Sequence, residues 1–456
     1  MAKHQPLGFC SAGEDTQRHV VLRVLVVLLC VGLSVFPIAI PTMAYTSRLK
    51  GPYAVQLKES AQDDEVHVVF VSDCSGHTGW QSELLFFSAQ YIGQRGAITQ
   101  VAVGCSIASQ KRMLQRLRSL GLPNEFKLHF VVPDTNDARS HTINKVYGLR
   151  SWFREVGPER DVVTFIDPDF IFVRPLTARI DATAMAYGWN ATERPERVRK
   201  GMPVAQRWPL MWWTDSKEQW RPPIARPPQN LSGAELMAWL CSGELGGQSL
   251  CAGATKEEVS LYHGTGVPHM WHRSDMDEWF VDTWADITTR YHVIDDGYYV
   301  EMHSMMMSHI HHGVRQFAVH NLSLRMPADA QGDRHLESWE FLAELQVDPC
   351  TSPMEQVLAH PRMGPFIHYC QNYPGWSKYW VHGYGKGGAH ALENCDANYS
   401  DGGLAKLLNA APNMSEPETA FIVCVTRRML AGAIKRTCAG RAAAKAVEDM
   451  SAGFTF

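Results

Sequence analysis

The stretch FIDPDFIFVRPL, residues 165–176, places two carboxylates, Asp167 and Asp169, on either side of a proline at the end of an apolar run. Burying one unpaired carboxylate is costly, and two that lie close together repel, so the pair must find a cation or meet water at a strand end. An Asp-x-Asp turn offers two hard oxygen ligands, which suit Mg²⁺ or Mn²⁺. The stretch therefore predicts a buried strand that ends in a metal site.

An aspartyl nucleophile is the alternative interpretation of this turn, because a phosphatase could also place Asp-x-Asp after a strand, with Asp167 attacking phosphate. Such a site would carry Thr or Val two residues beyond the second aspartate, where this chain has Ile171. The residue at this position favours the metal site.

Strand and helix patterns alternate along the chain before this stretch. Apolar runs at residues 66–72, 98–105 and 126–133 predict strands, and helical periodicity marks residues 80–92, 111–122 and 143–156. This alternation predicts an α/β fold, a mainly parallel sheet flanked by helices, which binds ligands beyond the carboxyl ends of its strands. Asp73, Asp167 and Asp169 fall at such ends.

The N-terminal part of the chain carries an apolar run at residues 19–40, long enough to span a bilayer. We expect a cytosolic tail at 1–19, a transmembrane signal anchor at 20–40 and a stem at 41–65; a signal sequence cleaved near Ala44 is the alternative. The net charge of the 456 residues is only −4, with no basic block, so nucleic acid is not an expected partner.

Glycosylation sequons and cysteines place the rest of the chain in the lumen of the ER or Golgi, as a single-pass membrane protein. Nine cysteines follow the anchor without zinc spacing, so several should form disulfides and one should be left over. Cys74 and Cys105 close neighbouring strand ends and are expected to pair. The five sequons begin at Asn190, Asn230, Asn321, Asn398 and Asn413.

The later part of the chain predicts a globular domain over residues 66–390 and a C-terminal extension over 391–456. Residues 193–232, rich in Pro, Arg and Trp, predict an irregular excursion over the site, or a plain surface loop. Residues 266–314 predict helix, and 364–370 a strand. The group His303, His309, His311 and His312 predicts a polar helix face rather than a metal cluster.

Several motifs follow one another along the chain. They are FVSDCSGHTGWQSELLFFSAQYIGQRGAITQVAVGC (70–105), TINKVYGLRSWF (142–153), FIDPDFIFVRPL (165–176), GVPHMWHRSDM (266–276), YYVEMHSMMMSHIHHGV (298–314) and FIHYC (366–370). In this order they resemble the hydroxyproline O-arabinosyltransferases and the related peptidyl serine alpha-galactosyltransferases. The resemblance covers roughly residues 66–369 in scattered blocks.

The resemblance implies a GT-A-like glycosyltransferase that moves arabinose or galactose from a UDP donor to a hydroxyproline or serine hydroxyl of a Pro-rich or Ser-rich peptide, with retention at the anomeric carbon. Asp167 and Asp169 would bind Mn²⁺ or Mg²⁺, with His368 as third ligand, because imidazole suits Mn²⁺ alongside carboxylates. A hydrogen-bonded strand histidine is the alternative for His368.

The resemblance also implies roles for other side chains. Glu301 would be catalytic, orienting the acceptor hydroxyl or stabilising positive charge on the sugar, although a buried carboxylate is as often simply paired. A non-catalytic luminal protein that binds carbohydrate or peptide with the same fold is the alternative function. The other implied contacts are Ser72 and Asp73 with uridine or ribose, Asn144 and Lys145 with diphosphate, and Trp80 and Gln81 with donor or acceptor.

Overall fold

The computed structural model describes residues 64–132, 141–180, 186–187, 196–208, 239–241, 250–294, 300–325, 336–370, 372–373, 376–378 and 416–452. The predicted tail, the signal anchor and nearly all of the stem lie outside these residues, as do the sequons at Asn190, Asn230, Asn398 and Asn413. Within the described ranges, no helix is both long enough and apolar enough to cross a bilayer.

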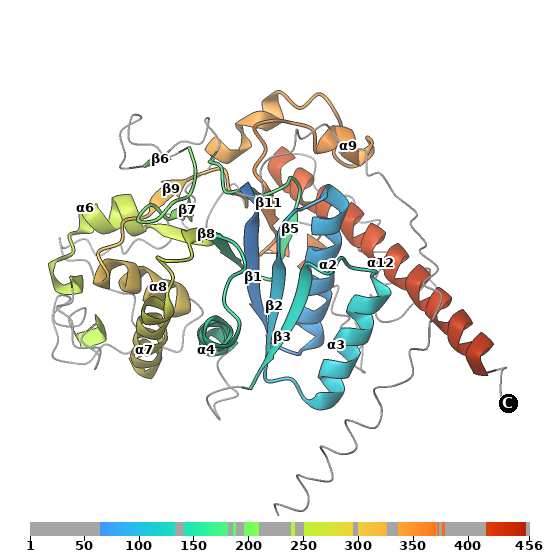
Figure 1. Ribbon diagram of the computed structural model, residues 1–456. Coiled ribbons are helices and arrows are strands. Elements are labelled where there is room, and N and C mark those ends of the chain that lie inside the picture. Colours follow the sequence, from blue (N-terminus) through green and yellow to red (C-terminus); the bar gives the residue numbers. More distant parts are fainter. Residues whose placement is uncertain are drawn as a thin grey trace, which may run out of the picture. The chain divides into compact units, whose positions relative to one another are not determined.

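An eight-stranded sheet carries the fold (Figure 1). Its strands, in spatial order, are β3 (Phe126–Val131), β2 (Ile98–Val103), β1 (Val66–Ser72), β4 (Val162–Ile166), β8 (Thr265–His272), β7 (Val204–Arg207), β9 (Phe317–Val319) and β6 (Ala186–Tyr187). The first four are parallel, and β8 joins them as an antiparallel neighbour of β4. β7 is antiparallel to β8 and parallel to β9. The predicted α/β fold with a mostly parallel sheet is confirmed.

Helices cover both faces of this sheet. The helices and single turns are α2 (Gly76–Ile92), α3 (Ile107–Ser119), α4 (His141–Glu155), η3 (Cys251–Gly253), α6 (Lys256–Glu258), η4 (Val259–His263), α7 (Glu278–Ile294), α8 (Val300–His311), η5 (Leu336–Ala343), α9 (Met354–Val357) and α12 (Pro417–Ala452). α2, α3 and α12 pack on one side, and α4, α7 and α8 on the other (Figure 1). Ser75 and Ser106 cap α2 and α3 with their hydroxyls, so both helices begin before the first residue that periodicity predicts.

A second, three-stranded sheet extends from the turn after β4. It consists of β10 (Ser323–Leu324), β11 (Phe366–His368) and β5 (Phe170–Phe172), and it is followed by the pair β12 (Asn372–Tyr373) and β13 (Trp376–Ser377). β11 runs antiparallel to β5 with His368 opposite Phe170, and the Tyr369 amide donates to the Asp169 carbonyl. This pairing confirms the predicted strand and brings His368 to the Asp-Pro-Asp turn.

Two strands contradict the predictions for the second half of the chain. Residues 265–272 form β8 and are not helical, because Pro268 lacks an amide hydrogen and disfavours helix in the residue before it. β7 lies inside the predicted irregular excursion; its polar Gln206 is buried, donating to the His320 carbonyl and accepting from the Ser323 amide. Residues 209–232 of that excursion lie outside the described part of the chain.

The predicted polar face of α8 is also wrong, because every residue of this helix is buried. α8 packs against α4, α7, η3 and η4, so its faces meet protein rather than water. Its imidazoles are neutral hydrogen-bonding groups: Trp271 Nε1 donates to His309 Nε2 at 2.9 Å, and His303 Nδ1 lies 3.2 Å from the Tyr291 hydroxyl.

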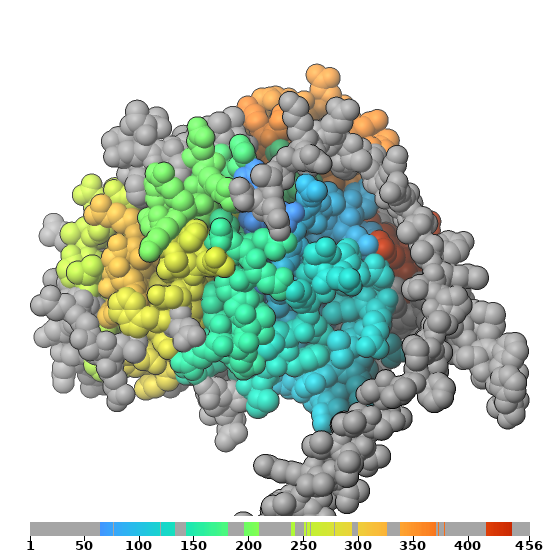
Figure 2. Space-filling model, viewed as in Figure 1, coloured from blue at the N-terminus to red at the C-terminus, as the bar shows by residue number. Residues whose placement is uncertain are grey.

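The C-terminal helix α12 belongs to the same core as the sheet. Phe421, Ile422 and Val425 are fully buried in that core, and the Phe421 ring lies edge-on to those of Trp339 and Phe341 in η5. In the space-filling view the red segment of α12 lies beside the blue and cyan segments of α2 and α3, in agreement with the contacts between these helices (Figure 2). The helix within the predicted C-terminal extension is therefore part of the globular unit.

Disulfides tie the described loops together. The predicted pair Cys74–Cys105 is present, with Cα atoms 5.3 Å apart. Cys438 is also disulfide-bonded, and Cys370 is free, in line with the expectation that one of the nine cysteines is left over. The remaining bridges join Cys241 to Cys251 and Cys350 to Cys424.

Truncation of one aromatic side chain tests the contribution of α12 to the core. Phe421→Ala should lower the free energy of unfolding by about 3 to 5 kcal/mol, because it removes a fully buried ring and leaves a cavity. Urea denaturation followed by circular dichroism measures this change. Lys435→Ala, an exposed substitution on the same helix, is the control. A loss below about 1 kcal/mol for Phe421→Ala would show that α12 is dispensable for the core.

Acid should destabilise the protein through its buried histidines. Burial lowers the pKa of His263, His269 and His303 from 6.5 to about 3. Below pH 6.5 the unfolded chain protonates these histidines while the folded protein keeps them neutral, so the free energy of unfolding falls as the pH decreases toward 3. At pH 5 the loss is about 2 kcal/mol per histidine. Urea denaturation at pH 7 and pH 5 measures the loss, and His303→Gln should reduce it. A free energy of unfolding that is the same at both pH values would contradict this expectation.

Candidate functional site

A pocket of about 380 Å³ opens where the parallel strands β1 and β4 end. The two strands are in register, with Phe70 beside Ile166, so the residues that follow them leave the sheet at the same edge. The pocket therefore collects side chains from both strand ends and from α2 and α4. Its polar lining residues are Ser72, Asp73, Ser75, His77, Thr78, Gln81, Asn144, Lys145, Asp167, Asp169 and Lys378.

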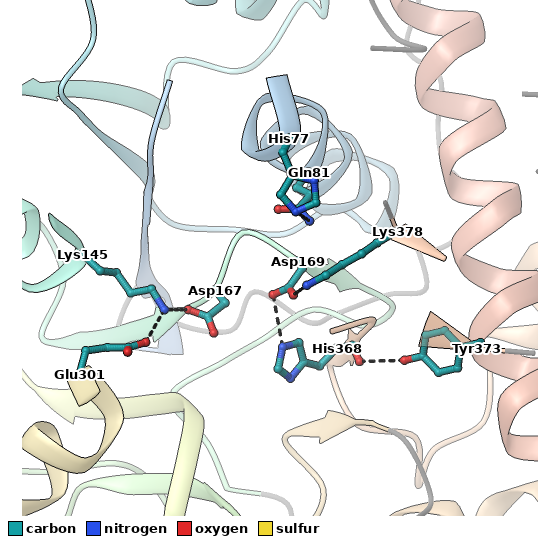
Figure 3. A network of polar contacts seen from close by, with 9 residues as sticks. All are labelled: His77, Gln81, Lys145, Asp167, Asp169, Glu301, His368, Tyr373 and Lys378. Atoms are coloured by element: carbon teal, nitrogen blue, oxygen red, sulfur yellow. Dashed lines mark hydrogen bonds and ion pairs between the residues drawn. The ribbon is translucent and has the colours of Figure 1, made fainter. Parts of the chain in front are cut away.

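Asp167 and Glu301 share one lysine. Lys145 Nζ lies 2.7 Å from Asp167 Oδ1 and 2.7 Å from Glu301 Oε1, and the three side chains form a chain from pocket to interior (Figure 3). Burial raises the pKa of Glu301, while the ammonium of Lys145 opposes that rise. Glu301 does not line the pocket, so the structure connects it to the site through Lys145.

Asp169 lies between a lysine and a histidine (Figure 3). Lys378 Nζ is 2.7 Å from Asp169 Oδ2, and His368 Nε2 is 3.3 Å from Asp169 Oδ1. Burial alone would raise the pKa of Asp169, but these two cationic partners hold it below its usual range. The imidazole of His368 stacks on Phe170, with ring centroids 4.2 Å apart, which fixes its orientation toward the aspartate.

Asp167, Asp169 and His368 fit the requirements of a divalent cation. One ligand atom from each lies within 4.8 Å of the others, and all three side chains are buried. Two carboxylate oxygens and one imidazole nitrogen suit Mn²⁺. Mg²⁺, a harder cation that prefers oxygen ligands, is the alternative. His368 Nδ1 is buried without a hydrogen bond of standard geometry in the described structure, although the Cys370 thiol also interacts with the ring.

The other side of the pocket is formed by the N-terminus of α2. Asp73 Oδ1 accepts from the Ser75 amide at 2.9 Å and from the hydroxyls of Ser75 and Thr78. Ser72 Oγ accepts from Gln100 at 2.8 Å, which fixes the end of β1. Ser72, Asp73, Ser75 and Thr78 thus bring one carboxylate and three hydroxyl groups to the pocket lining.

The structure places most of the predicted site residues in the lining of the pocket, whereas Trp80, Glu301 and His368 do not line it. Ser72, Asp73, Gln81, Asn144 and Lys145 line the pocket together with the aspartate pair, and Asn144 Oδ1 is buried without a partner there.

Trp80 lies away from the pocket: its ring is fully buried, 5.7 Å from the ring of Tyr369, in the position expected of a packing residue.

Four polar residues of the pocket were not predicted: Ser75, His77, Thr78 and Lys378. His77 lies one turn before Gln81 on α2, and a helical i, i+4 spacing from Gln81 could have revealed it. Lys378 lies beyond the last recognised motif, and no local pattern marks it. The only available signal was electrostatic, because two neighbouring carboxylates remain charged more readily beside cationic side chains.

The sequon at Asn321 is the one that falls within the described residues, and this asparagine is partly exposed between β9 and β10. Its glycosylation remains a prediction.

Comparison with known proteins gives a curated relative, the peptidyl serine alpha-galactosyltransferase of Chlamydomonas reinhardtii, which is 30% identical over 115 residues. The predicted resemblance is confirmed. The match covers 24% of this chain and only 14% of that protein. No protein-family model matches the chain.

Solved structures of two glycosyltransferases show a distant similarity of fold. The bifunctional glycosyltransferase WbbM, in its apo form, has 13% identity and a TM-score of 0.39 over 78% of this chain and 52% of its own. The galactosyltransferase LgtC, in complex with donor and acceptor sugar analogues, has 11% identity and a TM-score of 0.36 over 68% of this chain and 89% of its own.

Substitution of one aspartate tests the metal site. Asp169→Asn should weaken Mn²⁺ binding by at least about tenfold. Loss of a residue that only hydrogen-bonds to a metal ligand usually lowers metal affinity by about that factor, and loss of a ligand itself should cost at least as much. Isothermal titration calorimetry with Mn²⁺ measures the affinity, and circular dichroism checks the fold. Asp161→Asn, an exposed aspartate paired with Arg273, is the control. Equal Mn²⁺ affinity in both variants would exclude Asp169 as a ligand.

Proposed function

We propose that the chain is a metal-dependent glycosyltransferase that moves a sugar from a UDP donor to a hydroxyl group of a protein. The observation that carries this proposal is the convergence of Asp167, Asp169 and His368, from strands about 200 residues apart, beside a pocket at the carboxyl ends of parallel strands. The similarity to a peptidyl serine alpha-galactosyltransferase supports the same reaction class.

The pocket suits a nucleotide diphosphate. A bound Mn²⁺ or Mg²⁺ would neutralise charge on the diphosphate and so favour its departure. Lys145 and Lys378 add two ammonium groups to the pocket lining, one beside each aspartate of the pair, where they can stabilise the leaving phosphate. Ser72 and Asp73, which follow the neighbouring strand β1 and line the same pocket, are suited to the hydroxyls of the nucleoside.

The acceptor hydroxyl would attack from the face that the diphosphate leaves, which retains the anomeric configuration. The departing phosphate can take the proton, so this geometry needs no strong general base. Glu301, buried behind Lys145, then acts as a positioning residue that holds the ammonium in place. We propose arabinose or galactose as the sugar, and hydroxyproline or serine in a luminal protein of the ER or Golgi as the acceptor.

UDP release from a panel of UDP-sugars, with Pro-rich and Ser-rich peptides and a Mn²⁺ titration, tests the proposal. Asp169→Asn should reduce turnover by roughly a hundredfold or more, since electrostatic stabilisation of the leaving group is usually the largest catalytic contribution. Glu301→Gln keeps the shape and should reduce turnover less. A folded wild-type chain that binds sugars or peptides but releases no UDP with any donor would identify a non-catalytic binding protein instead.

A further inference from the structure

Each aspartate of the Asp-Pro-Asp turn is paired with a lysine from a different part of the chain. Lys145 of α4 lies 2.7 Å from Asp167, and Lys378, which directly follows β13, lies 2.7 Å from Asp169. Both lysines line the pocket, although their side chains are only 17% and 6% exposed. Figure 3 shows them reaching the two carboxylates from separate elements. The protein itself therefore supplies each of these two aspartates with one ammonium group.

The paired carboxylates are also the candidate ligands of a divalent cation. Oxygen atoms of Asp167 and Asp169 belong to the group whose ligand atoms lie within 4.8 Å of one another. A cation bound to these side chains would stand close to both ammonium groups, and like charges repel strongly where water is excluded. Cation and lysines therefore compete for the same two aspartates.

A diphosphate resolves this competition. Its oxygens accept charge-assisted hydrogen bonds from lysine, and the pocket that both lysines line lies at the aspartate pair. We propose that Lys145 and Lys378 exchange partners: they neutralise Asp167 and Asp169 before the donor binds, and turn to the diphosphate when a divalent cation takes the aspartates. This inference rests on the proposed function and adds that the two lysines couple cation affinity to donor affinity.

Glu301 supports the exchange on the side of Lys145. Its Oε1 accepts from Lys145 Nζ at 2.7 Å, and its carboxylate is buried on α8, outside the pocket lining. When Asp167 is taken by a cation, Lys145 keeps this second carboxylate partner. The ammonium therefore stays at the pocket wall, where a phosphate oxygen can reach it.

Mn²⁺ affinity of the full chain, measured by electron paramagnetic resonance with and without UDP, tests the exchange. Lys378→Met and Lys145→Met each remove one competing ammonium group, so Mn²⁺ affinity without UDP should rise roughly tenfold or more, and UDP should increase it less than in wild type. Lys378→Arg keeps the charge, so Mn²⁺ affinity without UDP should rise less than in Lys378→Met. Lys127→Met, whose lysine pairs with Glu159 at the surface, is the matched control and should change nothing.

Three outcomes are distinguishable. Methionine variants that bind Mn²⁺ as wild type does and keep the effect of UDP would overturn the exchange and leave the proposed function intact. A wild-type chain that binds neither Mn²⁺ nor UDP would overturn both. If the methionine variants do not fold, the wild-type protein still tests the exchange. The exchange requires Mn²⁺ and UDP to raise each other's affinity by the same factor. Independent binding of Mn²⁺ and UDP to wild type would therefore refute it.

Discussion

Two carboxylates separated by one residue at the end of a buried strand cannot both remain charged unless cations lie beside them. This constraint determines which parts of the chain must meet at the Asp-Pro-Asp turn. Lys145 reaches Asp167 from α4, and Lys378 and His368 reach Asp169 from the segment around β11 and β13. The site is thus an assembly of distant segments around one local turn.

The fold supplies this assembly through strand pairing. Parallel pairing of β1 with β4 brings Ser72 and Asp73 to the edge where Asp167 leaves the sheet. Antiparallel pairing of β11 with β5 sets His368 against the same turn. The Cys74–Cys105 disulfide then joins the chain after β1 to the chain after β2 and holds the pocket wall.

Local patterns were sufficient for the first half of the domain. Apolar runs and helical periodicity predict the parallel strands and their helices, and a carboxylate directly after such a run is expected at a strand end. This reasoning located Asp73, Asp167 and Asp169. It could not locate Lys378, because that lysine is defined by an ion pair with Asp169, 209 residues away.

Polar residues inside the core account for the main errors. α8 carries three buried histidines, which look like a solvated face until the Trp and Tyr partners of two of them are known. β7 was likewise missed within a segment whose Pro, Arg and Trp content predicted an irregular excursion, although both ends of the buried Gln206 amide are satisfied, by the His320 carbonyl and the Ser323 amide. Burial of such groups depends on distant hydrogen-bond partners, and a single sequence does not reveal these partners.

Crystals of the full chain grown with Mn²⁺ and UDP would test the central claim most directly, through the anomalous signal of manganese. The account predicts one peak in contact with carboxylate oxygens of Asp167 and Asp169 and a nitrogen of His368, with Lys145 and Lys378 turned to the diphosphate. A peak elsewhere, with both lysines still paired to the aspartates in the presence of UDP, would contradict it.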